Sequence, residues 1–159
     1  MNVFYRVDNR LVHGQIISTW MSHLRVKTFL VVSDSVPENS LQMTMFRMAI
    51  PTELNYLALS ISDAAAWLNN QRNSSDSVMV LMETIEDAAR LFEAGHPFPL
   101  LNIGNIHHAA GRRSFSNAVF LGEPEIDRLK GLFGRGVRAE IQSLPNEQPI
   151  DLRRALEAA

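Results

Sequence analysis

The residues best suited to chemistry lie near the start of the chain, in the stretch Arg6-Val7-Asp8-Asn9-Arg10-Leu11-Val12-His13-Gly14-Gln15. A neutral imidazole such as His13 can attack phosphorus without a separate base, because its ordinary pKa lies near about 6.5. The phosphohistidine formed would be negatively charged, and the guanidinium groups of Arg6 and Arg10 could meet that charge with fixed N–H donors. The spacing therefore predicts a phosphoryl acceptor flanked by cations.

Neighbouring residues of this loop have both chemical and structural interpretations. Gly14 and Gln15 are expected to open a helix, so that free backbone N–H groups point at the loop and at a bound phosphate. Asp8 could orient Arg10 or the imidazole, or could simply turn the chain. Arg6, at the end of the preceding strand, could serve the phosphoryl group, pair with Asp8 or contact a partner surface.

A second polar loop, Asn102-Ile103-Gly104-Asn105-Ile106-His107, follows a later apolar run. Gly104 would allow a close backbone approach there, and His107 is expected to face the same cleft as the first loop. A metal site is not expected, because the adjacent His107 and His108 should point in different directions and no cysteine or paired acidic ligand lies near them. The remaining histidines are interpreted as solvated or turn residues: His23, His96 and His108.

Short apolar runs alternate with helical patterns along the chain. Strands are expected at Val3–Val7, Thr28–Val32, Leu54–Leu59, Val78–Met82, Leu100–Ile103, Ala118–Leu121 and Val137–Ile141. Helices are expected at Gln15–Leu24, Leu41–Ile50 and Leu152–Leu156, after caps at Ser62 and Thr84, and from Pro124. This order predicts an α/β fold, a mostly parallel sheet with helices on both faces, in which ligands bind at the carboxyl ends of the strands. If the first and fifth strands are neighbours, the two polar loops form one cleft.

Two helices carry predictions about their buried faces. In Leu41–Ile50, the residues expected to face the core share one side: Leu41, Met45, Met48 and Ala49. In the helix capped by Ser62, the expected inner face holds Ala65, Ala66 and Leu68.

Composition narrows the functional classes. With 159 residues, 46% of them hydrophobic, the chain is expected to form one domain spanning residues 1–159. Its net charge of −2 argues against a nucleic-acid binder, and the lack of cysteine excludes disulfides and thiol catalysis. Neither a signal peptide nor a membrane-spanning run is expected, so a membrane role would have to come through a partner.

The first loop resembles the active loop of the enzyme IIB components of the mannose/fructose/sorbose class of bacterial sugar phosphotransferase systems (PTS), which reads Arg-hydrophobic-Asp-acidic-Arg-Leu-hydrophobic-His-Gly-Gln. Asn9 is the one departure, since an acidic residue is common there, and the change could alter loop polarity or a partner contact. The resemblance extends to the chain length, the order of elements and the second loop. It implies an open, mostly parallel twisted sheet with an antiparallel edge.

The resemblance also implies a function. A cytoplasmic phosphotransferase would accept a phosphoryl group from an enzyme IIA on Nδ1 of His13 and pass it to a sugar held by the membrane components IIC and IID. Catalytic roles fall on His13, Arg10, Arg6 and Asp8, without a metal or an organic cofactor. The phosphate loop would comprise Gly14, Gln15, Asn102, Gly104 and His107. Arg6, Arg10 and the exposed face of the helix from Gln15 are the candidate docking surface.

Several alternatives stay open from the sequence. Phosphorylated His13 could report the state of the phosphotransferase system without serving transport. From another class, the cleft could bind a phosphorylated metabolite reversibly. The sugar cannot be read from the chain, and apolar edge strands would permit a homodimer.

Overall fold

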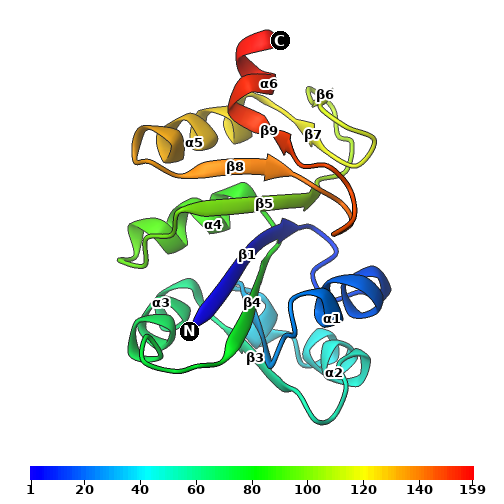
Figure 1. The fold of residues 1–159 in the computed structure, drawn as a ribbon, viewed down its shortest axis with the longest axis vertical. Coiled ribbons are helices and arrows are strands. Elements are labelled where there is room, and N and C mark those ends of the chain that lie inside the picture. Colours follow the sequence, from blue (N-terminus) through cyan, green and yellow to red (C-terminus); the bar gives the residue numbers. More distant parts are fainter.

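The computed structural model describes residues 1–159 and places seven strands in one sheet, in the order β3-β2-β4-β1-β5-β8-β9 (Figure 1). Their bounds are β1 (Asn2–Asp8), β2 (Thr28–Val32), β3 (Asn55–Leu59), β4 (Ser77–Met82), β5 (Leu100–Asn105), β8 (Arg138–Ile141) and β9 (Ile150–Asp151). All neighbours run parallel except β8 and β9. The predicted mostly parallel sheet with an antiparallel edge is confirmed.

Helices cover both faces of this sheet, as predicted. They are α1 (Met21–His23), α2 (Ser40–Ala49), α3 (Ile61–Asn70), α4 (Ile85–Glu93), α5 (Glu123–Gly134) and α6 (Leu152–Ala158), with a 3₁₀ turn at Val36–Glu38 and a π-helical turn at Ile16–Trp20. The larger core cluster packs the sheet against α3, α4 and α5, and the smaller one packs it against α2 and the helical segment that leads into α1. No helix is both long and apolar enough to cross a membrane.

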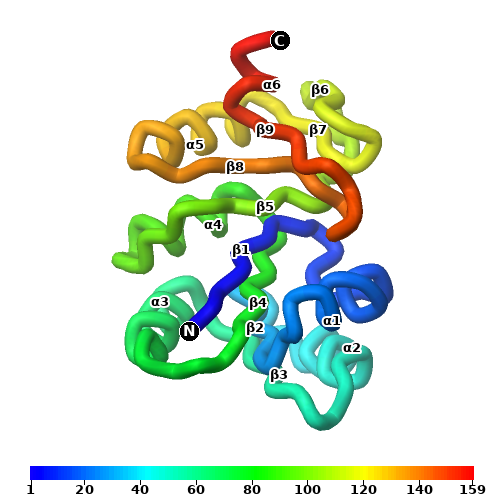
Figure 2. The backbone as a smooth tube through the Cα atoms, in the orientation of Figure 1, coloured from blue at the N-terminus to red at the C-terminus, as the bar shows by residue number.

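The two polar loops meet at one edge of the sheet because β1 and β5 are adjacent (Figure 2). Arg6 lies opposite Asn102, and Asp8 lies opposite Asn105 after a register shift that follows Val7. The backbone N–H of Asn9 extends this pairing by donating to the carbonyl oxygen of Asn105 at 3.0 Å. The predicted convergence of the loops is thereby confirmed.

The predicted inner face of α2 is wrong. Leu41, Met45 and Met48 are 71%, 59% and 81% exposed, and Ala49 is exposed as well. The helix instead buries Phe46, with Met43 packed partly beside it. Apolar residues lie on several sides of this helix, so spacing did not identify the buried face, and the largest side chain took the interior position.

Three smaller predictions also need correction. Ser60, not Ser62, caps α3 by accepting from the backbone N–H of Asp63, which turns Ala66 outward. The Ala118–Leu121 run supplies only β7 (Phe120–Leu121), which pairs with β6 (Arg113–Ser114) in a separate hairpin. This short hairpin lies outside the main sheet, and Val119 of the same run forms a parallel bridge with Ile106, directly after β5.

His96 is buried, which corrects its interpretation as a solvated residue. Its Nδ1 donates to Oδ1 of Asn69 at 2.8 Å, and its Nε2 accepts from the Tyr5 hydroxyl at 2.6 Å. Both ring nitrogens are used by the neutral form, and burial lowers the pKa of His96 below its ordinary 6.5.

This buried histidine predicts a pH-dependent stability. Because the pKa of His96 is lowered in the folded state, its contribution is present above 6.5 and is lost as the pH falls toward the folded-state pKa. The free energy of unfolding from urea titrations should therefore fall more steeply between about pH 7 and about pH 5.5 in the wild type than in His96→Gln. Parallel slopes for the two proteins would contradict this.

Candidate functional site

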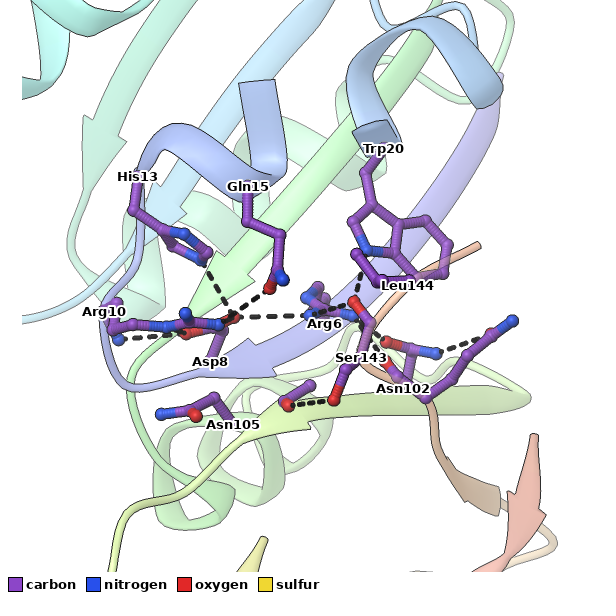
Figure 3. Close-up of polar contacts among 12 residues, drawn as sticks. Arg6, Asp8, Arg10, His13, Gln15, Trp20, Asn102, Asn105, Ser143 and Leu144 are labelled. Carbon is purple, nitrogen blue, oxygen red and sulfur yellow. Dashed lines mark hydrogen bonds and ion pairs between the residues drawn. The ribbon is translucent and has the colours of Figure 1, made fainter. Parts of the chain in front are cut away.

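Asp8 is the centre of the site at the carboxyl end of β1 (Figure 3). It is fully buried, and its Oδ2 accepts from Nη2 of Arg10 at 2.9 Å, from Nε2 of His13 at 3.0 Å and from Nη2 of Arg6 at 3.3 Å. Its Oδ1 accepts from Nε and from the backbone N–H of Arg10 at 3.0 and 3.1 Å. One carboxylate therefore orients the imidazole and both arginines.

These contacts determine the charge on Asp8. Burial alone would raise its pKa, but the hydrogen bonds from His13 and Arg10 and the nearby positive charges outweigh burial and lower the pKa to about 2. Asp8 is therefore a carboxylate at neutral pH and can only accept hydrogen bonds. The proton shared with His13 belongs to Nε2 of the imidazole.

The other ring nitrogen of His13, Nδ1, has no partner in the protein and is not buried. The side chain is 16% exposed, Nε2 is engaged by Asp8, and no protein group bonds Nδ1. With the Nε2 proton donated to Asp8, the Nδ1 lone pair is free in the neutral imidazole. The arrangement supplies an oriented nucleophile at an accessible position.

Arg10 provides the accessible positive charge of the site. Its side chain is 41% exposed, and its guanidinium donates from Nε and Nη2 to the two carboxylate oxygens of Asp8. Nη2 also donates to Oε1 of Gln15 at 3.2 Å. The predicted neighbours Arg10, His13 and Gln15 are thus brought together around one carboxylate. A planar guanidinium held in this way suits an incoming phosphoryl group.

Arg6 cannot be part of a docking surface, because its side chain is fully buried. It donates to Oδ1 of Asn102 at 2.6 Å and to the carbonyl oxygens of Gln142 and Ser143 at 2.9 and 3.2 Å. Burial lowers the pKa of Arg6 to about 10, against the raising effect of Asp8, so it remains charged at neutral pH. It supports Asp8 from inside the protein and has no exposed surface to offer a phosphoryl group.

Sequence reasoning missed three parts of this support. The ring of Trp20 lies 4.9 Å from the guanidinium carbon of Arg6, and its Nε1 donates to the carbonyl oxygen of Ser143 at 2.9 Å. The side chain of Gln142 accepts from Asn102 at 3.3 Å. Because the backbone carbonyls of a distant segment supply most of these bonds, no residue type or spacing could have indicated them.

Asn102 and Gly104 also have a supporting position. Asn102 is fully buried and bonds Arg6 and Gln142, so its side chain has no exposed surface to offer a phosphate. A Cβ atom on Gly104 would lie 1.8 Å from Nη2 of Arg6. The predicted close approach at Gly104 is therefore real, but its partner is a buried guanidinium.

We expect Gly104→Ala to destabilise the protein by about 1–3 kcal/mol, since the new methyl group must displace an arginine held by several acceptors. Urea titration measures this loss. The matched control is Gly131→Ala in α5, where a Cβ has nothing within 4 Å and where alanine favours the helix. Equal stability of the two variants would contradict the expectation.

The loop between Asp8 and His13 turns sharply. Leu11 adopts a positive φ of 57°, and its N–H donates to the carbonyl oxygen of Asp8 at 2.9 Å. Leu11 and Val12 are buried in the smaller core cluster and anchor this turn. Gly14 follows at the exposed start of the helical segment, which begins one residue before the predicted Gln15 and includes the π-helical turn that periodicity did not indicate.

A cavity of about 310 Å³ lies beside the two loops and includes Asn9 and His107 in its lining. Its two arginines are already paired, Arg112 with Glu125 at 2.9 Å and Arg128 with Glu86 at 2.6 Å. The cavity therefore offers no free cation to an anion. No group of three or more metal-binding side chains occurs.

The fold and the site define an open α/β protein that presents an oriented histidine and an arginine at the carboxyl edge of its sheet. The family model "PTS system sorbose subfamily IIB component" matches residues 2–159. The chain therefore belongs to this family and is a IIB component of a sugar phosphotransferase system.

Individual relatives agree with this assignment. The chain is 29% identical over 149 residues to the fructose-specific EIIB component of Bacillus subtilis, covering 94% of this chain and 91% of that protein. It is 26% identical to the mannose-specific EIIAB component of Escherichia coli strain K12, covering 92% of this chain but 46% of the longer relative. The crystal structure of an N-acetylgalactosamine IIB component from Streptococcus pyogenes is similar with a TM-score of 0.90, 26% identity and 97% coverage of both chains.

Proposed function

We propose that this IIB component is a phosphohistidine carrier that accepts a phosphoryl group on Nδ1 of His13. The observation that carries the proposal is the contact of Nε2 with Asp8, which leaves Nδ1 unengaged and accessible. A reversible phosphate-binding site would need cations free to hold an anion, whereas the exposed arginine of this site, Arg10, is paired with Asp8 and lies beside a potential nucleophile. Family membership supports the same chemistry.

The transfer step balances without a base or a cofactor. The Nδ1 lone pair of neutral His13 attacks the phosphorus of a phosphohistidine on the donor, the new N–P bond forms in line, and the donor's N–P bond breaks. The electron pair returns to the donor imidazole, and the Nε2 proton of His13 stays in place against Asp8. Most of the rate enhancement comes from the docking of the two proteins, which positions the two imidazoles in line with the phosphorus.

Charges near the loop favour the phosphorylated product. Asp8 accepts a hydrogen bond from the Nε2–H group of the phosphorylated ring, while Arg10 can turn part of its exposed guanidinium toward the phosphoryl oxygens. Arg6 holds Asp8 in position from the buried side. In this proposal Arg10 and His13 are catalytic residues, whereas Asp8 and Arg6 are positioning residues.

The binding partners are inferred from the names of the relatives and from the exposure of Arg10 beside His13. An enzyme IIA is the phosphoryl donor, and a sugar held by membrane components IIC and IID is the acceptor, to which the protein docks from the cytoplasm. Both partners must reach the same nitrogen, so they bind alternately. The docking surface comprises Arg10 and the exposed side of the helical segment from Gly14, without Arg6.

The test is phosphoryl transfer from a reconstituted chain driven by phosphoenolpyruvate with a cognate IIA. We expect an acid-labile, alkali-stable label on the wild type, and ³¹P NMR should assign it to Nδ1. Adding membranes that contain IIC and IID should discharge the label to a sugar phosphate. A label that no sugar discharges would favour a regulatory phosphoprotein, and no label with a phosphorylated IIA would contradict the carrier function.

A further inference from the structure

The side chain of Asn9 joins the His13 loop to the second loop. Its Oδ1 accepts from Nδ2 of Asn105 at 2.5 Å, and its Nδ2 contacts Nδ1 of His107. Because Oδ1 is occupied as an acceptor, Asn9 presents N–H groups to His107, and Nδ1 of that ring must accept. We call these two contacts the clasp. It requires His107 in its neutral form, with the proton on Nε2.

The position of the clasp matters because the loop it holds is strained. Leu11 has its positive φ only two residues beyond Asn9, and such a conformation persists only where surrounding contacts enforce it. Burial of Leu11 and Val12 enforces it on one side of the turn. On the other side of the turn, Asn9 is half-buried and polar, so hydrogen bonds and not apolar packing must hold the backbone in place.

We propose that Asn9 is a positioning residue for phosphoryl transfer, whose clasp with neutral His107 and Asn105 holds Asp8 and His13 in their reactive arrangement. The inference rests on the function proposed above. Asn9 follows Asp8 directly, so a shift of the loop would move the carboxylate that orients the imidazole. An amide suits this position because one group both accepts from Asn105 and donates to His107.

The clasp has a consequence that a purely structural asparagine would lack. A protonated His107 carries N–H groups on both nitrogens and faces the amide of Asn9 with a donor, which opens the clasp. The benefit of Asn9 should therefore be lost in the form of the protein whose His107 carries N–H groups on both nitrogens. The charged or titratable groups that line the same cavity as His107, or follow it in the chain, come from several elements: Glu83, Glu86, His108, Arg112, Glu125 and Arg128.

The experiment compares the rate of labelling of wild type and Asn9→Ala at about pH 8 and about pH 5, where an ordinary imidazole is almost wholly neutral and almost wholly protonated, respectively. We expect Asn9→Ala to be about fivefold slower at the higher pH, as for a lost hydrogen bond. The deficit should shrink to less than about twofold at the lower pH, because protonation has already opened the wild-type clasp.

Two further variants make the test specific. Glutamine at position 107 can accept from Asn9 but does not titrate, so in a His107→Gln background the deficit of Asn9→Ala should be the same at both pH values. Asn70→Ala, on the exposed side of α3, is the matched control and should label at the wild-type rate.

Several outcomes would overturn the proposal. One is a labelled wild type that Asn9→Ala matches within about twofold at the higher pH, which is below the effect of one lost hydrogen bond. Another is a deficit that does not change with pH while His107 is present. An unlabelled wild type would overturn the proposed function together with this inference, so the two failures are distinguishable.

Discussion

Replacing His13 with glutamine is expected to lower phosphoryl labelling by at least about a hundredfold, because an amide nitrogen has no lone pair available for attack. Glutamine can still place an N–H donor against Asp8, where Nε2 of His13 now donates at 3.0 Å. The surrounding arrangement should therefore survive, and the free energy of unfolding should change by less than about 1 kcal/mol. The measurement is the label incorporated per protein by a phosphorylated IIA.

The matched control for this variant is His108→Gln. His108 is exposed after the second loop, outside the proposed docking surface, and its ring lies edge-on to that of Phe120. It should accept as much label as the wild type. Substantial label on His13→Gln, with the fold intact, would place the phosphoryl group on another residue and refute the assignment of His13.

Substituting Asp8 with asparagine is expected to cost both stability and transfer. The neutral amide would leave the buried Arg6 without its counter-charge, which should destabilise the fold by about 3 kcal/mol or more. It would also present N–H groups toward Arg10 and His13, which removes the acceptor that holds the imidazole tautomer. We expect labelling to fall by about a hundredfold at a temperature where the variant is folded.

The pH dependence of stability gives this prediction a second readout. The pKa of Asp8 is lowered from 3.8 to about 2, so its contribution is present above 3.8 and is lost as the pH falls toward 2. Asp8→Asn should lack this loss. Asp127→Asn, on the exposed side of α5, is the control and should match the wild type in urea titrations and in labelling. Unchanged stability of Asp8→Asn would contradict the central role of this carboxylate.

Much of the fold followed from local patterns. The continuous apolar runs at β2 and β4 predicted buried strands, and the cap at Thr84 was confirmed by its bond to the backbone N–H of Asp87. Such signals work because a run of consecutive apolar residues is itself typical of a strand covered on both faces, and a helix cap is a bond between residues three apart in the chain. The inner face of α2 failed for the opposite reason, since only packing against the sheet decided that Phe46 would be buried.

In the candidate site, too, some features were predictable from local sequence and others depended on the tertiary structure. The spacing of Asp8, Arg10 and His13 within six residues brought their side chains to one loop, and the sequence alone was enough to indicate their chemistry. A motif of consecutive residues following a strand is determined locally, so it can be recognised without knowing the rest of the fold.

Only the tertiary structure decided which arginine is accessible. Arg6 and Arg10 look alike in the sequence, yet Arg6 is buried against Asn102, Gly104 and the carbonyls of a distant segment, whereas Arg10 stays exposed. The clasp of Asn9 likewise depends on the adjacency of β1 and β5. Local sequence determined which side chains of the proposed site share one loop, while pairing of strands far apart in the chain determined their burial, because exposure depends on what the rest of the protein packs against each side chain.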